Sequence, residues 1–334
     1  MKVKTAGSLA KYIELFFVDY LINQKSVSTH TVASYRDTFS LFLAFVKTSS
    51  GKMPDTLNIE DIDSEIIVNF LNYLEIERGV KARTRNQRLA GLRSFYRYLS
   101  IKRPDLSHHI QQILAIPQKR FEPTPLIFLN NVEIDALLNA PDQSTLMGRR
   151  DFTLILFLLQ TGLRVSELTG LTFSDVNLDG ASYVTCIGKG RKKRSTPLTK
   201  RTAKIMKKWL SEKERDNDEF IFENAKGKQF SADGIQYLLT KYSAIASKAC
   251  PSLTKKKISP HVIRHTTAMK LLSAGVDIAT IALWLGHESI ETTKIYLTAD
   301  LKMKEDALKK VNPTCKSNFR YKPSNKILRF LESL

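Results

Sequence analysis

The sequence predicts a mainly α-helical protein of two domains, the second of which includes a small antiparallel β-sheet. Apolar residues follow helical spacing through the first third of the chain. A stretch with three prolines then breaks that spacing, and one strand–turn–strand pattern stands among further helices in the second part. A length of 334 residues agrees with two domains, because single hydrophobic cores stop growing at roughly 250–300 residues.

Four amphipathic segments fill residues 1–116, which we assign to an all-α domain. Ser28 or Thr31 is available as the N-cap of the second segment. The apolar positions of the four segments are Leu9, Tyr12, Ile13, Phe16 and Tyr20; Val32, Tyr35, Phe39, Phe42, Leu43 and Val46; Ile66, Phe70, Leu71 and Leu74; and Leu89, Leu92, Tyr96 and Leu99.

A proline-bearing stretch marks the domain boundary. Residues 117–126, PQKRFEPTPL, follow neither helical nor strand spacing. Because proline fixes φ and restricts the residue before it, we predict an extended linker here. We assign the second domain to residues 127–313 and a C-terminal tail to residues 314–334.

The second domain combines helices with one hairpin. Residues 152–159 predict a buried helix, and a new helix begins near Arg164. Residues 184–198 predict two strands joined by a turn at Gly188 and Gly190. From there helical spacing resumes, with interruptions, to about Val311.

The composition indicates a polyanionic partner. Lys and Arg number 52 against 33 Asp and Glu, a formal net charge of +19. Such an excess is typical of proteins that bind nucleic acid and, less often, an anionic membrane surface. The fourth N-terminal segment carries arginines outside its apolar face; a solvated surface is the plainer interpretation, but we name them as DNA-binding candidates: Arg85, Arg88, Arg93 and Arg97.

The cysteine pattern and hydropathy argue against secreted and membrane proteins. Cys186, Cys250 and Cys315 lie far apart and suggest neither a disulfide framework nor a zinc site, so a reducing cytoplasm fits. Charges interrupt the N-terminal apolar segment, unlike in a signal peptide. The longest apolar run, residues 152–159, is too short for a bilayer, which takes about 20 residues. We expect a soluble cytoplasmic protein.

Two motifs place cations near the start of the second domain, and each also has a plainer interpretation. In TGLRVSEL, residues 161–168, Arg164 would open a helix whose first backbone N–H groups favour an anion; the alternative is a surface ion pair with Glu167. In GKGRKKR, residues 188–194, Lys189 would project from the hairpin turn, where a lysine can protonate an alkoxide; the alternative is a solvated basic loop.

A third motif is HVIRHT, residues 261–266. His261 and Arg264 share a helix face, and together they suit a phosphate. His265 could pair with His261 on a metal, but Val262 stands where an HExxH motif has its glutamate. We predict no metal site.

The fourth motif is LGHESIETTKIYL, residues 285–297, with His287 and Tyr296 as its chemically active side chains. Taken alone, Tyr296 is either a core aromatic on a helix or a nucleophile, and the core aromatic is the plainer interpretation.

In their order and spacing, the four motifs closely resemble those of the tyrosine recombinases, the phage-integrase superfamily. The resemblance extends over nearly the whole chain, because the N-terminal helices are similar to the family's SAM-like core-binding domain. It implies an all-α core-binding domain, followed by a mainly-α catalytic domain with a small antiparallel sheet.

The resemblance implies that a set of side chains binds the scissile phosphate. Arg164 and Arg264 would clamp it, and His287 would hydrogen-bond a non-bridging oxygen. His261 would hydrogen-bond the phosphate and assist proton transfer with the tyrosine. Glu167 resembles the family's acidic residue beside the first arginine and would orient that arginine.

The resemblance also implies the reacting groups. Tyr296 would attack to give a 3′-phosphotyrosine, and Lys189 would protonate the departing 5′-oxygen. A tyrosine has a pKa near 10, so surrounding cations must favour its phenolate character. The hydroxyl of Tyr296 is therefore expected to face DNA, with Arg164, Arg264 and His261 nearby. We expect no cofactor, and we add the rest of the hairpin turn as DNA-binding candidates: Arg191, Lys192 and Lys193.

The implied partner is double-stranded DNA at specific recombination sites, bound by a homotetramer on two synapsed sites through a Holliday junction. Accessory recombinases or DNA-bending proteins are further implied partners, and a membrane is not.

The sequence IALWLGHESIETTKIYL favours recombinases of transposons or mobile elements, and the chain is expected to lack an arm-binding domain. Xer-like dimer resolution, type IB topoisomerase-like relaxation and a non-catalytic DNA-binding protein stay open. The tail has Ile327, Leu328, Leu331 and Leu334 at helical spacing, and docks either on its own domain or on a neighbouring subunit.

Overall fold

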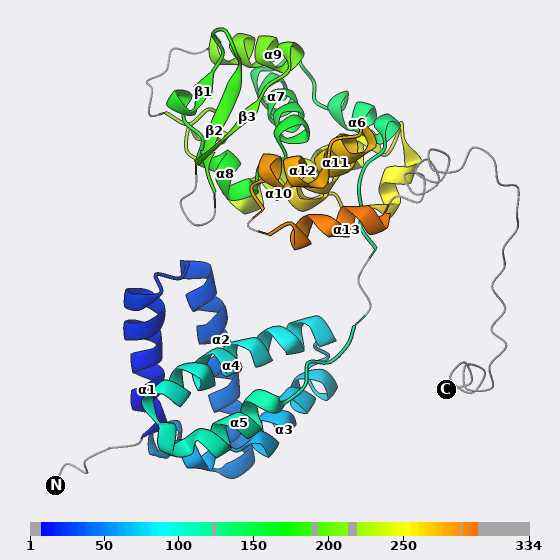
Figure 1. Cartoon of the computed structure of the whole chain (residues 1–334). Coiled ribbons are helices and arrows are strands. Elements are labelled where there is room, and N and C mark those ends of the chain that lie inside the picture. The colour runs from blue at the N-terminus through cyan, green and yellow to red at the C-terminus, as the bar shows by residue number, and fades with distance from the viewer. Residues whose placement is uncertain (1–7, 122–124, 189–192, 213–218, 288, 300–334) are drawn as a thin grey trace, which may run out of the picture. The chain divides into compact units, whose positions relative to one another are not determined.

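In a computed structural model, the chain divides into two compact units, Met1–Pro123 and Thr124–Leu334 (Figure 1). The structure describes residues 8–121, 125–188, 193–212, 219–287 and 289–299, with backbone only at 294 and 297–299. The division lies inside the stretch 117–126 in which the sequence places the linker. Each unit has its own hydrophobic core.

The described part of the first unit is helical, as the sequence predicts. Ser28 caps α2, where its hydroxyl accepts a hydrogen bond from the backbone N–H of Thr31. The helices are α1 (Leu9–Leu15), the π-helix η1 (Phe16–Gln24), α2 (Thr29–Ser50), α3 (Ser64–Ile76), α4 (Ala82–Lys102) and α5 (Ser107–Ala115), with single 3₁₀ turns η2 (Pro54–Thr56), η3 (Ile59–Asp61) and η4 (Pro104–Leu106).

The first apolar segment departs from the single α-helix that its spacing predicts. After α1 the chain continues as the π-helix η1. A π-helix brings residues five apart onto one face. Phe16 and Leu21 are such a pair, and both are buried. Edge-to-face ring contacts continue this core, with Phe95 at 5.5 Å from Phe16 and 5.4 Å from Phe39 between ring centroids.

The second unit is mainly helical with one small sheet, which confirms the predicted fold class. Its elements are α6 (Asn131–Leu138), α7 (Leu146–Thr161), α8 (Val165–Thr169), η5 (Phe173–Asp175), β1 (Val176–Asn177), β2 (Tyr183–Ile187), β3 (Lys193–Pro197), α9 (Lys200–Leu210), α10 (Ala232–Ala246), η7 (Pro251–Lys255), α11 (Pro260–Ser273), α12 (Ile278–Leu285) and α13 (Glu291–Ala299).

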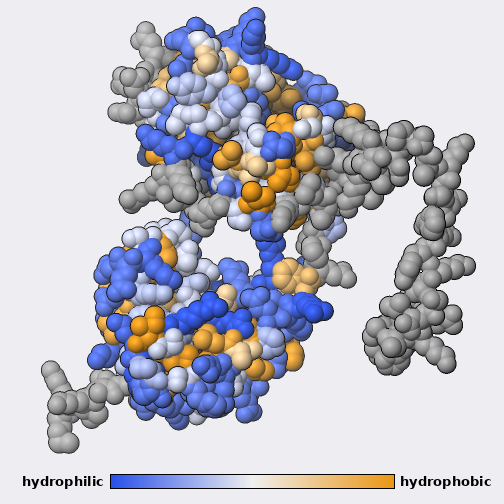
Figure 2. Space-filling view, in the orientation of Figure 1, coloured by the Kyte–Doolittle hydropathy of each residue, from blue (hydrophilic) through white to orange (hydrophobic). Residues whose placement is uncertain are grey.

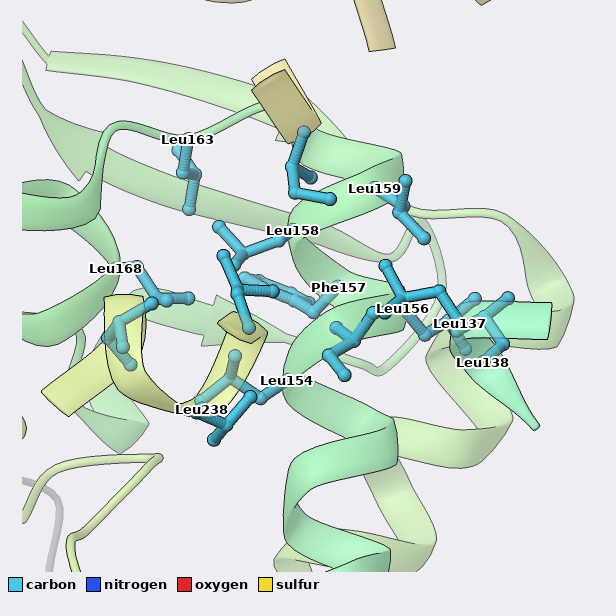
Figure 3. Close-up of a cluster of buried hydrophobic side chains, with 14 of the residues drawn as sticks. Leu137, Leu138, Leu154, Leu156, Phe157, Leu158, Leu159, Leu163, Leu168 and Leu238 are labelled. Carbon is cyan, nitrogen blue, oxygen red and sulfur yellow. The ribbon is translucent and has the colours of Figure 1, made fainter. Parts of the chain in front are cut away.

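Helix α7 is the centre of this unit. Leu154, Ile155, Phe157 and Leu158 are fully buried, and leucines from α6 and α10 surround them (Figure 3). The helix packs against α9 on one side and α11 on another. Residues 153–159 of this helix are buried on all sides, so the C-terminal half of α7 is enclosed by the core.

The sheet is a β1–β2–β3 antiparallel ribbon, and its register aims one arginine inward. Val184 pairs with Thr196 and Cys186 with Arg194, and all four side chains are on the covered face. A slip of one residue would turn Arg194 to the solvent face.

The side of the molecule shown in Figure 2 is largely hydrophilic, with apolar patches in the region of α11 to α13. Leu283 and Ile290 are among the exposed apolar residues of these elements and their connection. In the part of the chain that the structure describes, no helix is both long and apolar enough to cross a bilayer.

Candidate active site

Three arginines meet at the C-terminal end of α12. The carbonyl of Trp284 accepts a hydrogen bond from Arg194 Nε at 3.2 Å, and that of Leu285 accepts from Arg264 Nη2 at 2.5 Å. The carbonyl of Gly286 accepts from Arg164 Nη2 at 2.9 Å. The last carbonyls of a helix have no partner within it and carry its negative dipole end, so they suit cations. Arginines from β3, α11 and the start of α8 therefore share three consecutive acceptors.

The C-terminal end of α7 is fixed to the same elements. The carbonyl of Leu159 accepts a hydrogen bond from Thr267 Oγ1, and that of Thr161 accepts one from Trp284 Nε1. The carbonyl of Gly162 accepts one from Arg264 Nη1 at 2.7 Å. Gly162 ends the helix in the left-handed region, at φ 62°. The guanidinium of Arg264 thus bridges the ends of two helices.

Glu167 lies between two of the arginines. Arg194 donates to both of its carboxylate oxygens, at 2.8 and 2.7 Å, and Arg164 Nη1 donates to Oε1 at 3.0 Å. Burial alone would raise the pKa of Glu167, but the hydrogen bonds from Arg194 and Arg164 outweigh it, and the pKa is lowered. Glu167 is therefore ionised and orients both guanidinium groups.

The sequence leaves two partners open at the start of α8, an external anion or Glu167, and the structure shows Glu167 there. The backbone N–H of Arg164, the N-cap residue, donates to Glu167 Oε2 at 2.7 Å. The anion at this helix end is the chain's own carboxylate. The side chain of Arg164, 29% exposed, is the part of the residue that can reach a ligand.

Positive charge exceeds negative charge in this cluster, and the pKa values reflect it. Burial, followed by the charge of Arg164, lowers the pKa of Arg264 to about 10. Burial and the three arginines lower the pKa of His287 to about 4. His287 is therefore neutral at pH 7 and lies within the field of all three guanidinium groups.

A hydroxyl fixes the orientation of His287. Its Nδ1 lies 2.7 Å from Oγ1 of Thr293, which is fully buried on α13. When the threonine hydroxyl donates to Nδ1, the neutral ring carries its proton on Nε2 and presents an N–H donor on its other side.

The Tyr296 side chain is 1% exposed, so the expectation of a hydroxyl facing DNA is wrong for this structure. Its ring packs in a small apolar cluster that includes Ala268 and Leu285. Its hydroxyl lies 3.0 Å from Nδ1 of His265. Burial raises the pKa of Tyr296, although the charge of nearby Arg264 works in the opposite direction.

The remaining predicted residues fall into two groups. Lys189, Arg191 and Lys192 lie outside the described residues. His261, in the first turn of α11, and Lys193, at the start of β3, are exposed. The structure thus brings together Arg164, Glu167, Arg264, His287 and Tyr296, while His261 lies at the edge of the group.

Three of the predicted DNA-binding arginines of α4 have partners within their own unit. Arg85 lies 3.5 Å from Glu75 of α3, Arg88 donates to the carbonyl of Ser34, and Arg93 donates to the carbonyl of Ile116. Arg97 is exposed. Burial and the charges of Arg97 and Arg85 lower the pKa of Arg93, so these arginines form one positive region.

Sequence reasoning missed two residues of the site. The sequence predicts Arg194 only as part of the second strand, and the pairing that sets it opposite Cys186 is a feature of the folded hairpin. His265 was considered only as a metal ligand. Among the described residues, no group of three or more His, Cys, Asp and Glu side chains is arranged to hold a metal.

Two family models match the chain. The model described as "Phage integrase family" matches residues 128–303, and that described as "Phage integrase, N-terminal SAM-like domain" matches residues 15–102. The first covers the whole described arginine cluster and Tyr296.

Relatives match over nearly their full length. A protein of Sinorhizobium fredii, y4rC, whose assigned name is integrase/recombinase, is 48% identical over 98% of this chain and 99% of its own. Tyrosine recombinase XerD of Listeria monocytogenes is 31% identical over 89% of this chain and 97% of its own.

Solved structures share the fold. The Tn1549 transposon integrase in complex with transposon right-end DNA superposes with a TM-score of 0.70 at 16% identity, covering 92% of this chain and 100% of that one. The XerH recombinase bound to its difH substrate gives a TM-score of 0.66 at 22% identity, over 85% and 81% of the two chains.

Proposed function

From the premise that the chain belongs to the phage integrase family, as a site-specific tyrosine recombinase, we propose that it cuts and rejoins double-stranded DNA through a 3′-phosphotyrosine intermediate. Strand exchange then proceeds through a Holliday junction and serves the integration, excision or transposition of a mobile element.

The observation that carries this proposal is the excess of positive charge at the end of α12. Among the described residues, the guanidinium groups of Arg164, Arg194 and Arg264 face one carboxylate, that of Glu167. Burial first, and then the charge of Arg164, lowers the pKa of Arg264, and the negative charge of a phosphodiester would offset that repulsion. Fixed donors of this kind stabilise the extra charge of a phosphoryl-transfer transition state.

The side chains proposed to bind the phosphate each have N–H donors left for it. Arg264 spends two of its five N–H donors on Gly162 and Leu285, which orients the remaining donors. Arg164 is oriented in the same way by Glu167 and Gly286. Neutral His287 supplies an Nε2–H donor, and exposed His261 can reach a phosphate oxygen.

The reacting groups complete the mechanism. The Tyr296 oxygen attacks the phosphorus and the bond to the 5′-oxygen breaks, with Lys189 giving that oxygen a proton. Because the Tyr296 side chain is buried, the residues that cover its hydroxyl must move aside to admit the phosphate. Religation by another strand's 5′-hydroxyl reverses these steps and needs no ATP.

Assembly and location follow from the same premise. We propose a homotetramer on two synapsed sites, at the bacterial nucleoid, with accessory recombinases or DNA-bending proteins as further partners. The solved structures contain XerH bound to its difH substrate and the Tn1549 integrase in complex with transposon right-end DNA, which supports a DNA partner for this chain.

A nicked duplex tests the chemistry. The DNA is chosen by binding to the protein from a random-sequence library and is nicked so that the released fragment diffuses away. We expect a covalent protein–DNA band that Tyr296→Phe abolishes. Tyr237→Phe is the matched control, because Tyr237 is 73% exposed on α10 and should keep the band. A wild-type protein that binds but leaves no band would favour a non-catalytic DNA-binding protein.

The biological role needs a second test. The gene is placed on a plasmid with its own flanking DNA, and outward-facing primers detect joined ends of an excised circle. A joined-end product that requires Tyr296 supports a mobile element, whereas loss of plasmid multimers without such a product supports Xer-like resolution. Relaxation of a supercoiled plasmid that lacks the selected site would instead indicate topoisomerase-like activity.

A further inference from the structure

The hydroxyl of Tyr296 has one specific partner, a histidine to which the proposed function gives no role. His265 Nδ1 lies 3.0 Å from the tyrosine oxygen, and the two rings meet edge-on with 5.7 Å between centroids. His265 is on α11 directly after Arg264, so the same turn of helix presents a phosphate-binding arginine and this imidazole. The distance is that of a working proton-transfer pair.

The protonation states of the pair fit transfer from tyrosine to histidine. Burial, His261 and Arg264 lower the pKa of His265 below its ordinary value of about 6.5, so the ring is neutral at pH 7. Burial raises the pKa of Tyr296, so the phenol keeps its proton. A phenol O–H next to a neutral imidazole nitrogen donates to it.

The surroundings of His265 would make this base respond to substrate. His261 and Arg264 face it from its own helix, His287 from the α12–α13 connection, and Tyr296 from α13. The positive neighbours oppose an imidazolium while the site is empty. A phosphate bound by the arginines adds negative charge and removes part of this opposition, so His265 becomes a better base when DNA is present.

We propose that His265 is a catalytic residue that accepts the proton of Tyr296 during DNA cleavage. As the tyrosine oxygen forms its bond to phosphorus, its proton passes to Nδ1 of His265, and the bond from phosphorus to the 5′-oxygen breaks. That oxygen takes its proton from the leaving-group acid. In religation the 5′-hydroxyl attacks the phosphorus and returns its proton to the leaving-group acid, the bond from phosphorus to the tyrosine oxygen breaks, and His265 returns its proton to that oxygen.

Within the HVIRHT motif, the role in proton transfer passes from His261 to His265. The resemblance to the family gives assistance in proton transfer to His261, but His261 is exposed, and the hydrogen-bond partner of the tyrosine hydroxyl is His265. His261 then keeps the phosphate-binding role alone. The inference rests on the proposed function, because it needs Tyr296 as the nucleophile.

Two substitutions separate proton acceptance from simple hydrogen bonding. In His265→Asn the amide oxygen can stand near the position of Nδ1 and accept the tyrosine hydrogen bond, but it cannot take the proton. His265→Ala removes both functions. Single-turnover cleavage of the selected nicked duplex, at saturating protein, is measured against pH for both variants.

We expect His265→Asn to slow cleavage by about 10²-fold or more, with DNA affinity unchanged. In the wild type, activity should persist below pH 6.5 and fall at more acidic pH, as His265 gains a proton; in the variant this acidic limb should be absent. Imidazole added to the buffer should partly restore His265→Ala. With a sulfur in place of the bridging 5′-oxygen, whose thiolate leaves without a proton, His265→Asn should stay slow.

Other results would overturn the assignment. Cleavage by His265→Asn at the wild-type rate, while Tyr296→Phe is inactive, removes His265 from the reaction. Faster cleavage by His265→Ala would mean that the hydrogen bond only restrains the tyrosine. If the wild type itself gives no covalent band on the selected duplex, the proposed function has failed instead.

A spectroscopic measurement covers the case in which the variants do not fold. The protein has six histidines, so ¹⁵N resonances of a labelled sample can be assigned. We expect Nδ1 of His265 to be unprotonated at pH 7 and to shift in Tyr296→Phe. A proton found on Nδ1 would overturn the proposal.

Discussion

The arginines of α4 and those at the end of α12 are the same residue type in two different settings. On α4, Arg85, Arg88 and Arg93 have partners in three separate places, and Arg97 is exposed. At α12, by contrast, the arginines share three consecutive carbonyls and one carboxylate.

This difference separates two uses of positive charge. Charges distributed along a helix create a field that attracts DNA without fixing any one atom. Charges held by shared acceptors are fixed relative to one another, which a transition state requires. Substitutions on α4 should therefore change affinity, and substitutions at α12 should change the rate of cleavage at saturating DNA.

The largest effect is expected for Arg264→Lys. A lysine cannot span the carbonyls of Gly162 and Leu285 and still offer a planar pair of donors to phosphate. Single-turnover cleavage should fall by about 10³-fold or more, with DNA affinity changed little. Arg149→Lys is the control, because Arg149, at the opposite end of α7, also donates to two carbonyls and in addition to the carboxylate of Glu212. Equal losses in both variants would show that the arginines at α12 are not specifically required for cleavage.

Arg194→Met should come next, because it leaves Glu167 buried with one arginine partner fewer. Breaking a buried pair costs about 3–5 kcal/mol, so the melting temperature should fall. Cleavage should fall by about 10²-fold as Arg164 is displaced. Adding Glu167→Gln removes the buried charge that has lost its partner Arg194, so the double variant should regain stability but not cleavage. Recovery of cleavage would show that Arg194 has no positioning role.

Gly286→Ala tests the approach of Arg194 to the end of α12. A Cβ on Gly286 would lie 2.7 Å from Arg194 Nη1, and the residue has φ 65°. Gly275→Ala is a matched control, since Gly275 has φ 84° and nothing within 4 Å of a Cβ. Both variants should lose about 1 kcal/mol of stability from the left-handed backbone. Only Gly286→Ala should also slow cleavage, by about tenfold. Equal cleavage rates in the two variants would show that the close approach of Arg194 to Gly286 is not needed for cleavage.

The smallest effect is expected for Arg97→Gln, on the other side of the comparison. The slope of log affinity against log salt should become shallower by about 1, with cleavage at saturating protein unchanged. In Arg103→Gln the same charge is lost, but Asp105 and Glu60 already pair with Arg103, at 2.6 and 3.2 Å, so the slope should hold. An unchanged slope for Arg97→Gln would place it away from DNA.

The fold class and the order of the helices could be predicted because burial imposes a period on the sequence. Arg164, Arg264 and Tyr296 could be singled out because their motifs are local. Arg194 could not, since its inward direction depends on the pairing of two strands. Likewise, only packing against α13 brings His265, rather than His261, to the tyrosine hydroxyl. The burial of Tyr296 is tertiary as well, because its neighbours come from α11 and α12.

The three acceptors at the end of α12 are main-chain carbonyls, which every amino acid possesses. Selection can therefore preserve them only through the point at which the helix stops, and not through the identity of Trp284 or Leu285. Alanine in place of Trp284 or Leu285 would keep the carbonyl of that position, whereas an insertion or deletion of one residue before Gly286 would rotate all three carbonyls away from their arginines. Part of the site is thus inherited as a length of helix.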